Sequence, residues 1–152
     1  MLKVAIFYRA ASRSLSTRTG TLSPSNVHKG AYIETERIFT AQDVLSFSTL
    51  TGDVNPVHFQ PSELFKQPIV HGILVASLFS FLVSFDGAVY VKQTLDFKAP
   101  VIVGSPVYAR VEVVESHVRS KGTFVRCTTV CLIDERKVVA VEGTATVILP
   151  LV

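Results

Sequence analysis

The chain has 152 residues and a mass of 16.6 kDa, which is long enough for one domain with a substantial core and too short for two. Its formal charge is +3, but five of the fifteen basic residues lie within residues 1–29, which contain no acidic residue. Residues 30–152 hold ten basic and twelve acidic residues, so the body of the protein lacks the basic surface expected of a nucleic-acid-binding domain.

Residues 1–29 form a basic segment rich in serine, threonine and arginine. This acid-free composition is typical of a mitochondrial transit peptide, and the apolar stretch near its start is too short to span a bilayer. We therefore predict a transit peptide over residues 1–29, cleaved between Arg13 and Lys29, and a location in the mitochondrial matrix. The alternative interpretation is a disordered basic arm. The folded domain is then expected over residues 30–152.

The domain is expected to begin with a strand over residues 32–39, followed by a helix. Thr40 and Asp43 have the spacing of a capping box, and the apolar residues after them recur with a helical period. Gly52 is expected to end this helix, because glycine readily adopts the left-handed conformation that closes a helix. Residues 60–65 are predicted to form one further helical turn, with a proline near its start.

The loop at residues 51–58 reads Thr-Gly-Asp-Val-Asn-Pro-Val-His. Because Pro56 stiffens the loop, the side chains of Asp53 and His58 can converge on one point. A carboxylate and an imidazole placed in this way can accept and donate a proton in turn, which predicts an acid/base pair. In the structural alternative, Asp53 caps a turn and His58 is a satisfied structural histidine.

Residues 69–85 contain no charged residue and are predicted to form a helix that is buried on all sides. The run includes a glycine and three serines and lies at the lower limit of transmembrane length, so we predict no membrane span. Gly72 near its start would present a bare N–H at the positive end of the helix dipole, where it can stabilise an oxyanion. Alternatively, Gly72 permits close packing of helix on sheet, and His71 is expected to be structural.

Three serines in this run, Ser77, Ser80 and Ser84, share one stripe of the expected helix. Buried serines usually bond to carbonyls of their own helix, and the alternative is a polar wall beside the reaction site.

Four strands are predicted after the helix from alternation and β-branched composition, over residues 89–97, 107–115, 123–133 and 138–149. Cys127 and Cys131 fall in one of them, too far apart for a disulfide, and are expected to be small core residues. No spacing of cysteines or histidines indicates zinc, so no metal site and no cofactor is predicted. One buried helix followed by antiparallel strands predicts an α+β hotdog fold, in which the sheet wraps around the helix.

Residues 51–58, together with Ile-Val-His-Gly-Ile-Leu-Val-Ala-Ser-Leu-Phe-Ser at 69–80, closely resemble the MaoC-like, or hydratase-2, family of (R)-specific enoyl-thioester hydratases. Residues 90–101 and Val103-Gly104 look like that family's strand after the hotdog helix. The resemblance covers about residues 30–150. With the transit-like tail, it points to the mitochondrial (3R)-3-hydroxyacyl-thioester dehydratases of type II fatty acid synthesis within this family.

The resemblance implies that Asp53 and His58 are the catalytic pair and that the Gly72 amide forms the oxyanion hole. It also implies that Asn55 helps to hold the loop and that Ser80 lies beside the site. The implied reaction is the reversible loss of water from a (3R)-3-hydroxyacyl thioester to give a trans-2-enoyl thioester, with the histidine as base and the aspartate binding the hydroxyl. The implied partners are an acyl carrier protein or coenzyme A thioester as substrate and a second copy in a homodimer.

Two segments depart from the family pattern, because residues 59–70 and 85–89 are shorter than is usual there. Both are expected to border the acyl channel. The shortening keeps open a catalytically silent acyl-thioester-binding protein. A hotdog acyl-thioesterase is a further alternative, since one fold can host both reactions, although the loop at residues 51–58 resembles hydratases and not thioesterases.

Overall fold

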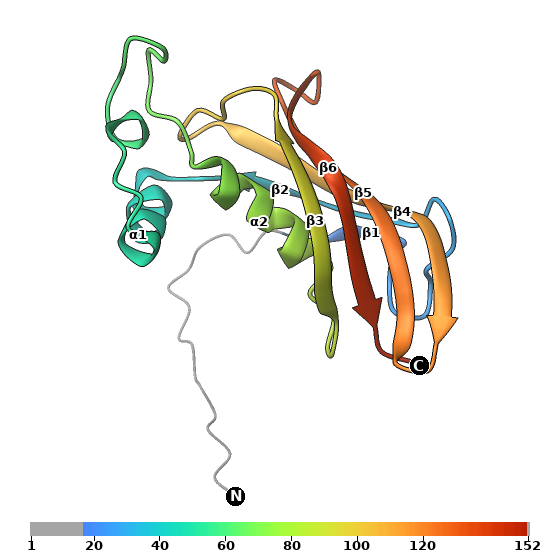
Figure 1. The fold of residues 1–152 in the computed structure, drawn as a ribbon. Helices are drawn as coiled ribbons and strands as arrows, with labels where there is room; N and C mark the ends of the chain where they lie inside the picture. Colours follow the sequence, from blue (N-terminus) through green and yellow to red (C-terminus); the bar gives the residue numbers. More distant parts are fainter. Residues whose placement is uncertain (1–16, 152) are drawn as a thin grey trace, which may run out of the picture.

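The computed structural model describes residues 17–151 and places a six-stranded antiparallel sheet around one helix (Figure 1). Within this range the strands are β1 (Thr19–Gly20), β2 (Tyr32–Ile38), β3 (Val89–Phe97), β4 (Pro106–Arg119), β5 (Gly122–Ile133) and β6 (Val138–Leu149). The helices are α1 (Ala41–Thr51), α2 (Gly72–Leu82) and a short 3₁₀ helix, η1 (Pro56–His58). The strand order is β1-β2-β4-β5-β6-β3, so β3 forms one edge beside the last strand.

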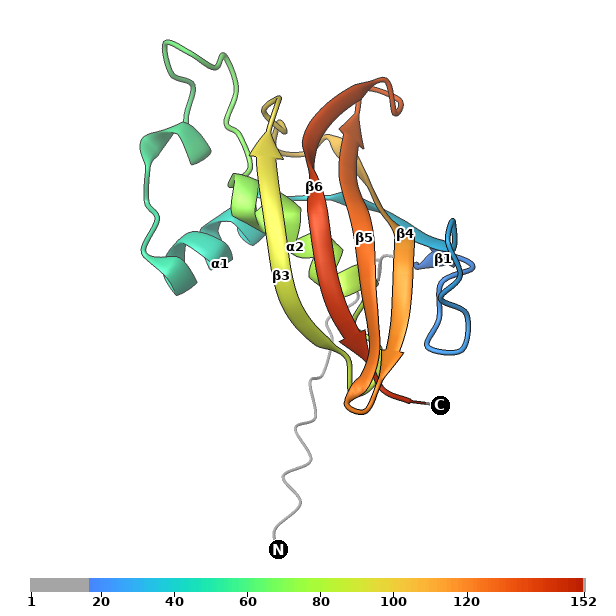
Figure 2. The ribbon, with the colours of Figure 1, turned by 45° about the vertical axis from the view of Figure 1, so that its right-hand side comes forward.

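The sheet curves over α2, which lies along one of its faces, and this arrangement confirms the predicted α+β fold (Figure 2). The four C-terminal strands are found where alternation predicted them. β4 continues further than expected, to Arg119, because its end pairs with the start of β5 at Gly122. Among residues 17–151, no helix has the length and apolar character needed to cross a membrane.

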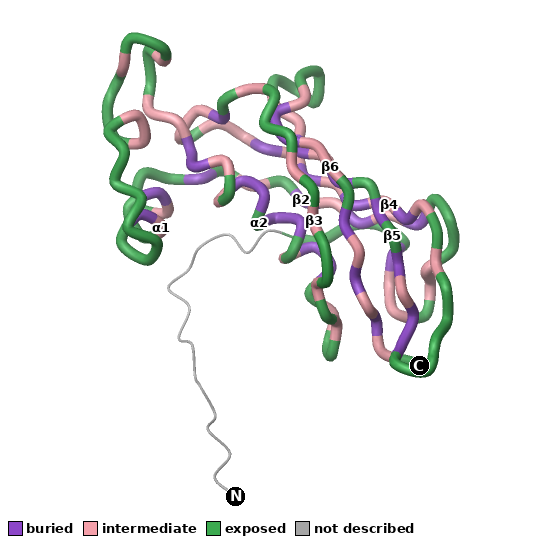
Figure 3. The backbone as a smooth tube through the Cα atoms, in the orientation of Figure 1, coloured by how far each residue is buried: buried purple, intermediate pink, exposed green. Residues whose placement is uncertain are grey.

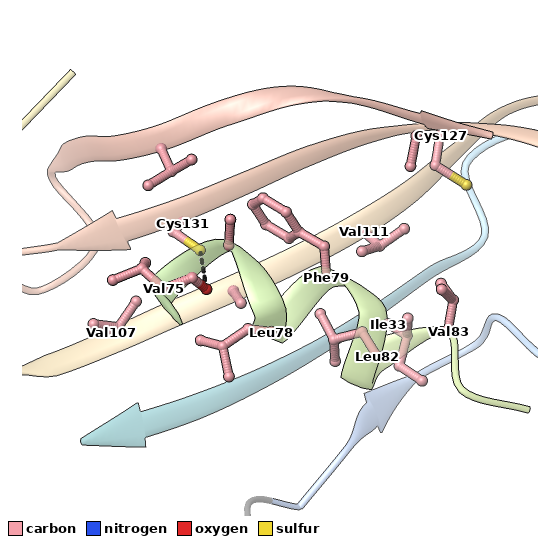
Figure 4. Packing of buried hydrophobic residues seen from close by; sticks show 14 of the residues in the cluster. Ile33, Val75, Leu78, Phe79, Leu82, Val83, Val107, Val111, Cys127 and Cys131 are labelled. Atoms are coloured by element: carbon pink, nitrogen blue, oxygen red, sulfur yellow. Dashed lines mark hydrogen bonds between the residues drawn. The ribbon is translucent and has the colours of Figure 1, made fainter. Parts of the chain in front are cut away.

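The core lies between α2 and the inner face of the sheet (Figure 3). The helix buries Val75, Leu78, Phe79 and Leu82 against it. Alternate residues of the central strands meet this surface, and the close view includes Val107, Val111, Cys127 and Cys131 (Figure 4). Both cysteines are free and fully buried, as predicted, and burial raises the pKa of each thiol to about 12.

The prediction that the uncharged run is a helix buried on all sides is wrong. Residues 69–71 are extended, since the Val70 N–H donates to the Val101 carbonyl at 2.8 Å, and the helix begins only at Gly72. Its outer face is open, with Ile73 57% exposed and the three serines also exposed. The run has no charge, yet only one face of it meets the sheet of its own chain.

The helical turn predicted at residues 60–65 is also absent. Ser62 closes a tight loop there, because its N–H donates to the Phe65 carbonyl at 2.8 Å and its hydroxyl accepts the Phe65 N–H at 3.1 Å. These bonds replace those of a helix. The short helix forms slightly earlier, as η1.

The described fold starts ahead of residue 30, where the sequence places the domain boundary. Thr19 and Gly20 pair with β2, and Leu22 is 5% exposed within the core. The first sixteen residues of the predicted transit peptide lie outside the described residues. Part of the segment assigned to the tail is therefore integral to the sheet.

Candidate active site

The Asp53 side chain follows directly from the end of α1. The helix has the predicted capping box, with the Asp43 N–H donating to Thr40 at 3.2 Å, and it stops at Gly52, whose φ is 79°. The next residue is Asp53, whose Oδ1 accepts the Asn55 N–H at 3.3 Å. The Asn55 side chain in turn accepts the Val57 N–H at 3.3 Å, which caps η1. These bonds give the loop one shape.

The orientation of the His58 ring is set by a backbone carbonyl. Its Nδ1 lies 2.8 Å from the oxygen of Ile69, and the Ile69 N–H donates to the Val57 carbonyl at 3.1 Å. A carbonyl can only accept, so Nδ1 carries the hydrogen and Nε2 of the neutral ring keeps a free electron pair. That nitrogen faces Asp53, at 3.9 Å from Oδ2.

The gap between the two groups suits an oxygen atom. At 3.9 Å, Asp53 and His58 do not hydrogen-bond directly, and one hydroxyl or water oxygen fits within bonding distance of both. The Asp53 side chain is 51% exposed and that of His58 is 10% exposed. A ligand can therefore reach the Asp53 carboxylate from solvent, while the His58 imidazole is largely shielded.

His71 joins this pair, which the sequence did not predict. Its ring stacks on the His58 ring with centroids 3.6 Å apart, and its Nε2 lies 3.9 Å from Asp53 Oδ2. One donor atom from each of the three residues lies within 4.8 Å of the others, a spread that could hold a metal ion. Sequence spacing did not indicate this cluster, because the three residues come from two separate segments. However, the His71 Nε2 is already within 3.2 Å of Ser48 Oγ and of the Asp53 carbonyl oxygen.

Gly72 starts α2, so its N–H has no carbonyl partner within its own helix. The structure also supplies the packing reason for a glycine. A Cβ atom at this position would lie 2.6 Å from Cε1 and 2.7 Å from Cδ1 of Phe97. A side chain at this position would therefore have to displace the Phe97 ring of β3, whatever the Gly72 amide does.

A pocket of about 460 Å³ opens beside Gly72. Its walls are mainly apolar and come from the 59–70 segment, the start of α2 and the end of β3; they include Phe65, Ile69, Val70, Gly72, Phe97 and Val101. Lys98 also lines the pocket, and its ammonium pairs with Glu142 at 3.3 Å. The shortened segment therefore borders an open pocket of the size of small-molecule sites.

Ser80 lies on the exposed face of α2, where it lines a smaller groove of about 190 Å³ with Ile73, Tyr90 and Gln93. Its neighbours Ser77 and Ser84 donate to the Leu74 and Phe81 carbonyls at 2.6 and 2.7 Å, the back-bonding predicted for these serines. Ser80 thus lines a different pocket from the one beside Gly72. Gly72 directly follows His71, which contacts Asp53 and His58.

The chain matches the family model described as "MaoC like domain" over residues 24–133. It is 38% identical over 133 residues to the "3-hydroxyacyl-[acyl-carrier-protein] dehydratase FERN, mitochondrial" of Solanum lycopersicum, covering 83% of this chain and 80% of that one. It is 33% identical over 127 residues to the "3-hydroxyacyl-[acyl-carrier-protein] dehydratase, mitochondrial" of Arabidopsis thaliana, covering 80% and 76%. Among solved structures, the (R)-hydratase from A. caviae involved in PHA biosynthesis aligns with a TM-score of 0.73 and 37% identity, over 81% of this chain and 97% of that one.

Proposed function

Because the chain belongs to the MaoC-like domain family, we propose that it removes water from (3R)-3-hydroxyacyl thioesters in mitochondrial type II fatty acid synthesis. It has the hotdog fold of that family and is a hydro-lyase of the (R)-specific hydratase and dehydratase group. The mitochondrial role is the finer part of the proposal. It draws on the two plant relatives and on the basic, acid-free tail.

The single observation that carries the chemistry is the free Nε2 of His58 facing Asp53 across 3.9 Å. The C3 hydroxyl of the substrate binds in this gap and donates to the Asp53 carboxylate. His58 Nε2 removes the proton from C2, the C3–O bond breaks, and the leaving hydroxyl takes that proton from the imidazolium to depart as water. A double bond forms between C2 and C3, and His58 returns to its neutral state.

The thioester oxygen becomes negative as the C2 proton leaves, and the Gly72 amide is suited to receive it. The amide lies at the positive end of α2 and has no intrahelical acceptor. Donors of this kind are worth about 3–4 kcal/mol in oxyanion holes. The apolar pocket beside Gly72 then holds part of the acyl thioester.

The test is hydration of a short trans-2-enoyl thioester by the purified full-length chain. The reaction is monitored as a decrease in the ultraviolet absorbance of the conjugated thioester. Asp53→Asn and His58→Ala should each reduce kcat by at least about 10²-fold, the contribution of one general acid/base group. Gln60→Ala, on the exposed loop after His58, is the control and should retain activity. Acyl carrier protein and coenzyme A substrates compared at equal concentration identify the preferred carrier.

The same assay separates the competing functions. Release of a free thiol with loss of the thioester bond would identify an acyl-thioesterase. Binding of the thioester with neither hydration nor hydrolysis would identify a silent binding protein. Retention of full activity in both variants would remove Asp53 and His58 from the mechanism.

We further propose that the protein acts as a homodimer in the mitochondrial matrix. β3 is an edge strand, and it carries exposed apolar side chains at Val89, Val91 and Phe97, which are 52–55% exposed. Such an edge is suited to a second copy of the chain. Sedimentation equilibrium measures the oligomeric state.

The cleavage site of the transit peptide is determined by N-terminal sequencing of the protein isolated from the matrix. We expect a mature N-terminus that leaves β1 intact, because β1 and Leu22 belong to the fold.

A further inference from the structure

His71 is almost fully buried beside the acid/base pair, and the mechanism above assigns it no task. Its side chain is 3% exposed, compared with 51% for Asp53. A structural histidine explains the burial. It does not explain why the ring contacts both members of the pair.

The His71 ring touches His58 face to face. The two centroids are 3.6 Å apart and the planes differ by 24°. Phe47 of α1 also packs on His71, with centroids 4.9 Å apart and planes at 54°. These contacts hold His71 in place, and they give the catalytic ring of His58 a flat surface against which it is positioned.

The His71 ring also holds the backbone of Asp53. Its Nε2 lies 3.2 Å from the Asp53 carbonyl oxygen and 3.2 Å from Ser48 Oγ, and Ser48 is itself 2% exposed. Since the carbonyl can only accept, Nε2 carries a hydrogen and donates it. One side chain therefore contacts the backbone of the acid and the ring of the base.

The other nitrogen of His71 takes no part in these contacts. Nδ1 is buried and has no hydrogen-bond partner among the described residues. The hydrogen-bonding contacts of the ring therefore all run through Nε2, toward Ser48 and the Asp53 backbone.

We propose that His71 is a positioning residue for the dehydration, in which its N–H fixes Asp53 and its ring face fixes His58 so that the 3.9 Å gap is preserved. This inference rests on the proposed function of the pair. Misplacement of a reacting group by about 1 Å can cost on the order of 10²-fold in rate. The expected loss is in kcat, because His71 is not among the residues that line the pocket.

Two substitutions separate the two contacts. His71→Phe keeps an aromatic face for His58 and loses the donor to Asp53, whereas His71→Gln keeps an N–H donor and loses the face. His71→Ala loses both and has the highest risk of not folding. The matched controls are His117→Phe and His117→Gln, on the exposed end of β4.

The measurements are kcat and KM for hydration, Kd for a saturated acyl thioester that cannot react, and Tm for each folded variant. We expect kcat to fall on the order of 10-fold to 10²-fold in the Phe and Gln variants, and further in the Ala variant, with Kd within about twofold of wild type. The His117 variants should match wild type in all three. A purely structural role would lower Tm without this selective loss of kcat.

Two results would overturn this inference and leave the proposed function standing. In the first, the folded His71→Phe and His71→Gln variants have the kcat of wild type while Asp53→Asn and His58→Ala are inactive. The proposed function then stands and this inference fails alone. The other is a loss of kcat matched by an equal loss of acyl-thioester affinity. If the wild-type protein hydrates no enoyl thioester, the proposed function and this inference both fail. Failure of the inference alone can therefore be told apart from failure of the proposed function.

Discussion

Alanine at Gly72 is expected to displace the Phe97 ring while leaving the proposed oxyanion donor in place. The new Cβ would lie 2.6 and 2.7 Å from two ring carbons, whereas carbon atoms in contact normally lie about 3.5–4.0 Å apart. The ring must therefore move by about 1 Å. Overpacking of this kind costs about 1–3 kcal/mol. Because Phe97 is 52% exposed and can swing toward solvent, we expect about 1 kcal/mol, at the lower end of that range.

The assay is urea unfolding of Gly72→Ala, Phe97→Ala and the double variant, arranged as a double-mutant cycle. Phe97→Ala alone should cost about 1–2 kcal/mol, since only about half of the ring is buried. In the double variant the clash is gone, so its total cost should be about 1 kcal/mol less than the sum of the single costs. Hydration measured on the same proteins adds a second test. Because Phe97 also lines the pocket, hydration by the double variant is compared with hydration by Phe97→Ala, and the two should match, since alanine keeps its N–H and the clash is absent.

Additive costs would refute this reasoning. If the two single costs sum to that of the double variant within about 0.3–0.5 kcal/mol, the glycine is not required by contact with Phe97. If the double variant is much less active than Phe97→Ala, the added methyl group obstructs the ligand itself.

Three further predictions concern the stability of the fold. Phe79→Ala should lower the free energy of unfolding by about 3–5 kcal/mol, because its side chain is fully buried between α2 and the sheet; a cost under 1 kcal/mol in urea unfolding would contradict that packing. Thr40→Ala should cost about 1 kcal/mol by loss of the α1 cap, checked by the same unfolding assay, and an unchanged midpoint would mean that the cap is dispensable. Burial raises the pKa of Cys127 and Cys131 to about 12, whereas unfolded thiols ionise near pH 8.5. The contribution of the two thiols to the free energy of unfolding is therefore complete below about pH 8.5. It falls as the pH rises toward 12, by up to about 1.4 kcal/mol per pH unit for each thiol. Cys127→Ala with Cys131→Ala should flatten this alkaline decline, and an equally steep decline in the double variant would rule the thiols out as its cause.

Local patterns predicted most of the elements. The Thr40 and Asp43 capping box and the Gly52 terminus depend on contacts a few residues apart, and both were found as expected. Alternation likewise predicted the four C-terminal strands, because side chains on a strand point to opposite faces by geometry alone. The α+β fold followed from the order of these elements.

Predictions that depended on neighbours distant in sequence were less reliable. An uncharged run indicated burial, but only tertiary packing determined that one face of α2 meets the sheet and the face with Ile73 does not. Composition placed the first residues of the chain in a tail, yet Thr19 and Gly20 pair with β2, a contact that the local sequence does not encode.

The sequence by itself predicted the acid/base chemistry and determined the shape of the loop that would carry it, because the residues from Asp53 to His58 are held by local bonds and a proline. Only the tertiary structure decided which nitrogen of His58 is free, since the bond that orients the ring comes from Ile69, eleven residues away. It also decided that His71 stacks on that ring and holds the Asp53 carbonyl. The physical reason is that hydrogen bonds and ring contacts depend on distance in space, which the chain fixes only when α1, the loop and the start of α2 have packed together.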